Sequence, residues 1–193
     1  MLRTWISAIA AGLVVCACAS QDQKIAAASE IKSSDDQFLP YREYTSGLYT
    51  ETGALLSKEA VRANVLVGRV DKTTGGKQFA VQVLLHYSED RRRKFESARN
   101  SRAEALQLVQ IERVRKNCDK KLDLCSFSEF VNILIPEPGL RGAGANGYPI
   151  KLFARSGDST VVDIPKAVIA SLLAKVDADP AIASAPAKVS QTP

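Results

Sequence analysis

KQFAVQVLLHY, residues 77–87, is the stretch of this chain that decides its fold. Bulky apolar side chains recur there at every second position: Phe79, Val81, Val83, Leu85 and Tyr87. The positions between them include the polar Gln78, Gln82 and His86. This alternation is typical of a β-strand that buries one face. We therefore predict a long strand here.

The neighbouring sequence extends this strand into a β-hairpin. A second strand is predicted over residues 62–70, and the linking DKTTGG contains glycines that supply the positive φ angles of a tight turn. A further strand is predicted over residues 42–50, where Tyr44, Leu48 and Thr50 share one face.

Residues 105–114 allow two interpretations. Ser101-Arg102-Ala103-Glu104 matches a helix capping box, which predicts the start of a helix. In the following ALQLVQIERV, however, the apolar alternation changes phase after Leu108, as in a strand with a bulge. We favour the strand. Together with residues 127–135 it forms a second predicted hairpin, whose tip carries Cys118 and Cys125.

The C-terminal third predicts one more hairpin and a helix. Residues 148–155 alternate cleanly, SGDS forms a turn, and residues 160–164 form a short strand. After Pro165, apolar residues recur at helical spacing as far as Val176. The expected fold class is mainly β, with antiparallel hairpins in a sandwich or open barrel and one C-terminal α-helix.

A length of 193 residues and an apolar share of 46% fit one globular domain. We place it at residues 41–177. Residues 18–40 lack a sustained apolar face and are expected to form a flexible tether, and the Ala-, Pro- and Ser-rich residues 178–193 a disordered tail.

The N-terminal sequence is typical of a targeting segment. Arg3 is followed by an apolar run and then by the small residues of Val15-Cys16-Ala17-Cys18, which is the pattern of a secretory signal. The last four residues resemble the lipobox of bacterial lipoproteins. The resemblance implies a signal peptide at residues 1–17, and lipid attachment and acylation at Cys18. Cys16 is a rival attachment site, but Leu13-Val14-Val15 before it fits the pattern less well. An ordinary signal cleaved near Ala19 is a further alternative.

The same resemblance implies a location. Acyl chains would anchor the protein to the membrane, and Ala19 after the lipidated cysteine favours the outer membrane, facing the periplasm. In that oxidising compartment Cys118 and Cys125 are expected to form a disulfide. A zinc site is the alternative, but two cysteines without a nearby histidine do not supply four ligands.

The formal charge of +5 favours anionic partners only weakly. Its densest part is Arg91-Arg92-Arg93-Lys94, which is either a solvated loop or a contact with an anionic membrane surface. Nucleic acid is not expected as a partner outside the cytoplasm. We expect an envelope protein or an anionic envelope polymer instead.

Three patterns suggest chemistry, each with a plainer interpretation. His86 is the sole histidine, so a Ser-His-Asp hydrolase would depend on it, but it lies at the end of a strand and no G-x-S-x-G motif supplies the serine. The segment 142–147 matches G-x-G-x-x-G, yet a strand follows where a dinucleotide site needs a helix. Glu129 lies among buried positions, either in a structural salt bridge with an arginine or as a ligand-binding carboxylate.

These observations favour a non-catalytic binding or assembly module of the cell envelope. A periplasmic hydrolase that uses His86 is the alternative, and a lipoprotein that merely occupies the membrane surface is a third. No metal or other cofactor is expected.

Overall fold

The computed structural model describes residues 20–51, 61–119 and 124–184. Cys18 and the predicted signal peptide at residues 1–17 lie outside the described residues, and so do residues 185–193 of the predicted tail.

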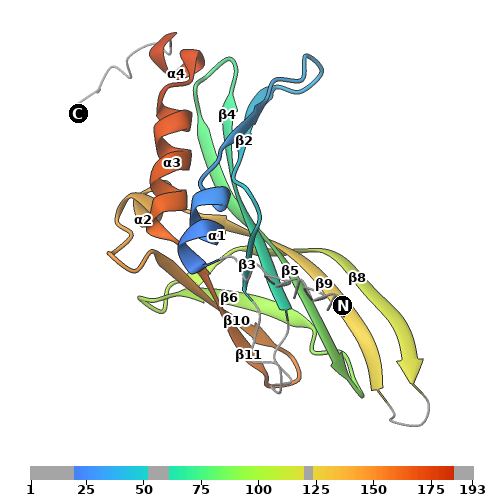
Figure 1. Cartoon of the computed structure of the whole chain (residues 1–193). Helices are drawn as coiled ribbons and strands as arrows, with labels where there is room; N and C mark the ends of the chain where they lie inside the picture. Colours follow the sequence, from blue (N-terminus) through green and yellow to red (C-terminus); the bar gives the residue numbers. More distant parts are fainter. Residues whose placement is uncertain (1–19, 52–60, 120–123, 185–193) are drawn as a thin grey trace, which may run out of the picture.

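Two antiparallel sheets and a long helix form the body of the protein (Figure 1). The large sheet has seven strands in the order β1-β2-β4-β5-β9-β8, with β3 paired to β4. Its strands are β1 (Lys32–Ser34), β2 (Tyr41–Thr45), β3 (Tyr49–Glu51), β4 (Val61–Asp71), β5 (Lys77–Glu89), β8 (Leu108–Asp119) and β9 (Leu124–Ile135).

The small sheet has four strands in the order β11-β10-β6-β7. They are β6 (Phe95–Asn100), β7 (Ala105–Leu106), β10 (Tyr148–Ala154) and β11 (Ser159–Ile164). The described helices are α1 (Gln21–Ala28), α2 (Glu137–Arg141), α3 (Lys166–Asp177) and α4 (Pro180–Ser184).

The predicted fold class and its three hairpins are confirmed. They are β4–β5, β8–β9 and β10–β11, and α3 is the predicted C-terminal helix. β5 pairs with β4 on one side and with β9 on the other, so the stretch at residues 77–87 is an interior strand of the large sheet.

The large sheet has a covered inner face and an open outer face. The inner face carries the fully buried Val81, Val83 and Leu85. In Figure 1, α3 lies over one part of this face and the small sheet over the other. α3 lies directly on β4 because Gly68 leaves room for it: a Cβ there would come within 2.8 Å of Val176 Cγ2.

Strand β6 has no counterpart in the predictions. It pairs with β10, which lies some fifty residues further along the chain, so no local pattern reveals it. The capping-box sequence after it does not begin a helix. Asn100 Oδ1 accepts hydrogen bonds from the backbone N–H groups of Arg102 and Glu104, and this side-chain bonding closes a turn instead.

The described part of residues 18–40 differs from the predicted flexible tether. Ser20 and Gln23 form a capping box at the start of α1, and the helix ends on the buried Ala28. β1 then pairs with β2 at the edge of the large sheet. Backbone pairing holds this segment in place, and such pairing leaves no apolar pattern in the sequence.

The beginning of the predicted disordered tail is also attached to the body. Asp179 is buried, and its carboxylate accepts two hydrogen bonds of 2.8 Å from Arg42 and one of 2.7 Å from the Tyr44 hydroxyl. It also accepts one from the Ala181 amide, which caps α4. Burial alone would raise the pKa of Asp179, but these hydrogen bonds outweigh it and hold the pKa below its ordinary value.

We expect Asp179→Asn to lower the free energy of unfolding at pH 7 by about 2–4 kcal/mol, because the ion pair with Arg42 is lost. A carboxyl whose pKa is lower in the folded protein stabilises it fully above the unfolded pKa of about 3.9 and progressively less as the pH falls below that value. Urea unfolding between pH 2 and pH 7 would show this acid-dependent loss in the wild type and a smaller one in Asp179→Asn.

Asp90→Asn is the matched control, because Asp90 is exposed. It should leave the free energy of unfolding within about 0.5 kcal/mol of the wild type. Equal effects of the two variants would contradict the role assigned to Asp179.

Candidate functional site

Most of the residues singled out in the sequence meet at one end of the large sheet, where β5 and β8 end and β9 begins. We call this region the disulfide end. It comprises Tyr87, Glu89, Arg92, Arg93, Arg113, Arg115, Cys118, Cys125 and Glu129.

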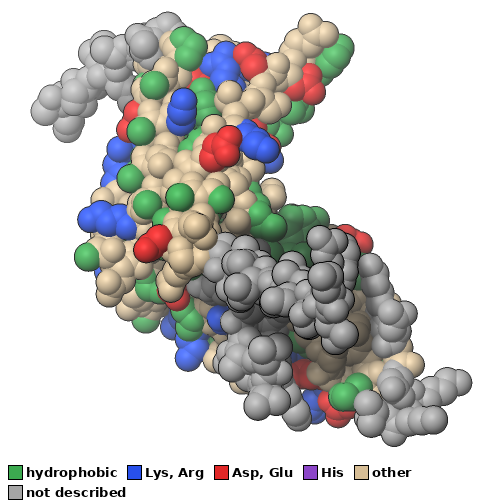
Figure 2. Space-filling model, in the orientation of Figure 1, with side chains coloured by type: hydrophobic (Ala, Val, Ile, Leu, Met, Phe, Trp, Pro, Cys, Tyr) green, Lys and Arg blue, Asp and Glu red, His purple; other side chains and the backbone are tan. Residues whose placement is uncertain are grey.

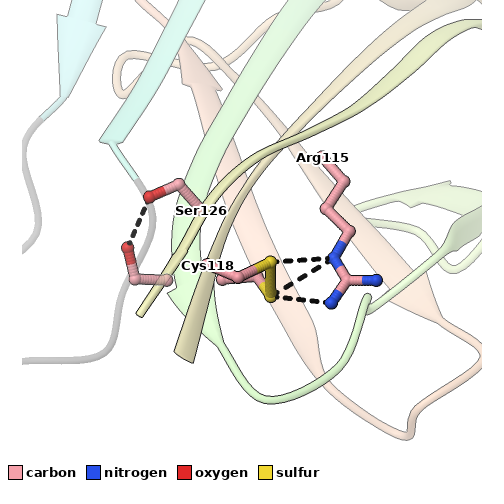
Figure 3. Close-up of a disulfide and its surroundings, with 5 residues drawn as sticks. Arg115, Cys118 and Ser126 are labelled. Carbon is pink, nitrogen blue, oxygen red and sulfur yellow. Dashed lines mark hydrogen bonds between the residues drawn. A yellow bond between two sulfur atoms is a disulfide. The ribbon is translucent and has the colours of Figure 1, made fainter. Parts of the chain in front are cut away.

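The predicted cysteine pair forms a disulfide. Cys118 and Cys125 lie opposite each other on β8 and β9, with their Cα atoms 4.0 Å apart. The Arg115 guanidinium lies against the sulfur atoms, as Figure 3 shows. Its Nε is 3.1 Å from Cys118 Sγ, and its Nη2 is 3.0 Å from Cys125 Sγ. The disulfide therefore has a cation in direct contact.

Glu129 is a fully buried carboxylate at the centre of the disulfide end. Oε1 accepts hydrogen bonds from the Tyr87 hydroxyl and the Lys94 amide. Oε2 accepts from the Phe95 amide and from Arg113 Nε, the latter at 3.3 Å. The salt-bridge interpretation of Glu129 is thus the one that the geometry supports, since four protein donors already occupy its lone pairs.

Tyr87 links Glu129 to the loop before β6. Its hydroxyl donates to Glu129 and accepts a hydrogen bond from the Arg93 amide. Burial raises the pKa of Tyr87, and the hydrogen bond to Glu129 raises it further. The phenol therefore stays neutral in the physiological range and acts as a donor in a structural network.

The basic run does not form one exposed patch. Arg93 is only 7% exposed and donates hydrogen bonds to the Glu89 carboxylate. The Arg92 guanidinium lies over the Phe127 ring, 5.7 Å from its centroid. Arg91 and Lys94 are exposed. Two of the four predicted surface contacts thus face the body, which the sequence alone did not indicate.

His86 lies on the outer face of the large sheet. It is exposed, and its Nδ1 is 3.0 Å from Ser128 Oγ on β9. The next cross-strand pair, Ser88 and Ser126, is 3.4 Å apart. Among the described hydrogen bonds of His86, none involves a carboxylate that would orient the ring as in a hydrolase triad.

Two adjoining hollows lie at the other end of the large sheet, the larger beside α2 and the smaller on the outer face. They have volumes of about 310 and 210 Å³ and share Gln78, Phe79 and Leu134. Asn132 lines the smaller one, and its Oδ1 has no hydrogen-bond partner in the part of the chain that the structure describes. The sequence pointed to this face through Gln78 and Gln82, but the contribution of β9 required the strand register.

The G-x-G-x-x-G segment connects α2 to β10, so a strand follows it as expected. Gly147 has a φ of +88°, and a Cβ there would lie 2.1 Å from the Ile164 carbonyl oxygen. The last glycine of the motif is thus explained by close packing on β11.

Within residues 20–51, 61–119 and 124–184, no group of three or more His, Cys, Asp or Glu side chains is arranged to hold a metal ion. No helix in these ranges has the length and apolarity to span a bilayer.

We expect Glu129→Gln to lower the free energy of unfolding by about 3–5 kcal/mol, because the amide leaves Arg113 without a counter-charge and turns an N–H group toward other donors. Urea unfolding of the oxidised protein measures this. Glu96→Gln is the matched control, since Glu96 pairs with Arg155 at the surface and should contribute no more than about 1 kcal/mol. A Glu129→Gln variant as stable as Glu96→Gln would refute the network.

Comparisons with known proteins do not add a relative from which a role could be carried over. No family model, no curated protein and no solved structure matches this chain.

Proposed function

We propose that the protein is a lipid-anchored lipoprotein of the outer membrane that faces the periplasm and acts as a non-catalytic binding or assembly module. The N-terminal sequence that ends at Cys18 supports the proposed lipid attachment and membrane location. The Cys118–Cys125 disulfide supports the location as well, because disulfides persist in oxidising compartments outside the cytoplasm.

The binding role rests on one observation, the exposed apolar side chains on the outer face of the large sheet. Leu84 on β5 is 43% exposed and Val109 on β8 is 44% exposed. The half-buried Phe130 on β9 lies directly beside Leu84 in the register. Ile111, at the bulge in β8, is 50% exposed. Apolar side chains that gather on one exposed face favour a protein-binding surface.

The distribution of charge favours a protein partner over an anionic polymer. Figure 2 shows the side of the molecule on which α3 is visible in Figure 1, and acidic and basic side chains are interspersed over its upper part. The basic run is divided, because Arg93 is committed to Glu89. An anionic polymer binds through a continuous cationic surface, whereas a folded envelope protein can match a mixed polar and apolar face.

We expect a photo-crosslinking residue placed at Leu84 or Val109 to form a covalent product of defined mass with one envelope protein in intact cells. The matched control position is Val161 on β11, which is 38% exposed but belongs to the small sheet. Crosslinking at Val161 alone, or equally from all three positions, would contradict a binding role for the outer face.

Lipid attachment at Cys18 is tested separately by measuring the intact mass of the mature protein. We expect a chain that begins at Cys18 and carries the added mass of a diacylglyceryl group and an N-acyl chain. Cys18→Ser should abolish that added mass and release the protein from the membrane fraction. A mature chain that begins at Ala19 or later would exclude lipid attachment while leaving the binding role open.

A hydrolase that uses His86 remains the alternative, and one observation favours it. The 3.0 Å contact between His86 Nδ1 and Ser128 Oγ brings together a general base and a hydroxyl. Both lie on the open surface of a sheet, and neither lines the hollows described above. Because a catalytic site holds its substrate in a concave pocket, this pair supports catalysis less well than the apolar face supports binding.

A further inference from the structure

The two cysteines of the disulfide are not equally accessible. Cys118 is exposed at the end of β8, whereas Cys125 on β9 is only 5% exposed. An incoming thiolate can therefore reach the Cys118 sulfur, and Cys125 is the sulfur that would leave. Thiol–disulfide exchange depends on both properties, which are access to the attacked sulfur and the stability of the departing thiolate.

The surroundings of Cys125 favour a departing thiolate. Arg115 directs two N–H groups at Cys125 Sγ, with Nε at 3.2 Å and Nη2 at 3.0 Å (Figure 3). A neighbouring arginine lowers the pKa of a thiol and stabilises its anion.

The charges on the neighbouring strand do not cancel this effect. Glu89 lies opposite Cys125 in the β5–β9 register, and a carboxylate there would disfavour a thiolate. Its negative charge is balanced by the ion pair with Arg93. The guanidinium of Arg115 therefore remains the positive charge in direct contact with the sulfur atoms.

We propose that Cys118–Cys125 is a thiol–disulfide exchange site whose substrate is a dithiol reductant. The attacking thiolate forms a bond to Cys118 Sγ, the Cys118–Cys125 bond breaks, and its electron pair moves to Cys125 Sγ, which leaves as a thiolate hydrogen-bonded to Arg115. The second thiolate of the reductant then attacks the reductant's other sulfur atom, which is bonded to Cys118 Sγ in the mixed disulfide. This step releases Cys118 as a thiolate, which takes a proton from water. The protein disulfide gains two electrons and the dithiol becomes a disulfide. This role is separate from the binding function proposed above.

The equilibrium test uses the full chain, purified in detergent with its disulfide intact and equilibrated in glutathione redox buffers. Thiols are then quenched by alkylation and counted by mass. We expect Arg115→Met to raise the equilibrium constant for the oxidised form about tenfold, which corresponds to a reduction potential lower by about 30 mV. Reduction by dithiothreitol should also become slower, because Cys125 is then a poorer leaving group.

Two further variants separate this role from a structural one. Arg91→Met removes one positive charge from an exposed position and should leave both the equilibrium constant and the rate unchanged. Arg115→Lys keeps the charge and should restore part of the effect. The proposal is overturned if Arg115→Met, with wild-type circular dichroism, changes the equilibrium constant by less than twofold.

The assignment of the attacked sulfur is tested with single-cysteine variants and oxidised glutathione. Cys118 in Cys125→Ser should form a mixed disulfide at least tenfold faster than Cys125 in Cys118→Ser. This comparison does not require Arg115 to be changed, so it still tests the proposal if Arg115→Met does not fold. Equal rates, or a wild-type disulfide that stays oxidised in excess dithiothreitol without denaturant, would identify an inert structural crosslink.

Discussion

The buried carboxylate of Glu129 is the interaction on which the arrangement of the two sheets depends. It comes from β9 and is hydrogen-bonded to Tyr87 on β5, to Arg113 on β8 and to the backbone at the start of β6. Removing a charge from water costs several kcal/mol, and the charge is tolerated only where its hydrogen-bonding capacity is used. Two backbone amides help to meet this requirement, that of Lys94 at the end of the loop before β6 and that of Phe95 at the start of β6. Glu129 thereby links the large sheet to the first strand of the small sheet.

Local periodicity explains why the large strands could be predicted. Phe79 to Tyr87 alternate because one face of β5 is buried and the other is open, and the same holds for β9 and β10. β6 could not be predicted in this way, because it pairs with β10, which is distant in the sequence. β1 could not be predicted because it is a three-residue edge strand whose side chains are all exposed, so it has no apolar alternation. Asp179 was missed for a related reason. Its burial depends on Arg42 and Tyr44, which lie more than one hundred residues away.

The candidate site also contains residues whose roles could be predicted from the sequence and residues whose roles could not. The cysteine pair could be predicted from the N-terminal signal pattern, because two body cysteines have few other uses in the oxidising compartment that this pattern implies. The roles of Arg113 and Arg115 could not be predicted, because they depend on the register shift between Gln110 and Glu112 in β8. In a regular strand both arginines would share the outer face with Val109. The extra residue reverses the phase, so that Arg113 points toward Glu129 and Arg115 toward the disulfide.

The same bulge also bears on where a partner can bind. β8 is an edge strand of twelve residues, and a long flat edge of that kind is a template for pairing with another chain. Two register shifts interrupt β8, one at Gln110/Glu112 and one at Lys116/Cys118. Bulges twist an edge away from such pairing, and basic residues on the strand add repulsion between like edges. The β8 edge is therefore poorly suited to strand addition, which agrees with the proposal that a partner would bind through the apolar side chains of the outer face. The bulge between Gln110 and Glu112 thus orients Arg115 toward the disulfide and also interrupts the edge of the sheet.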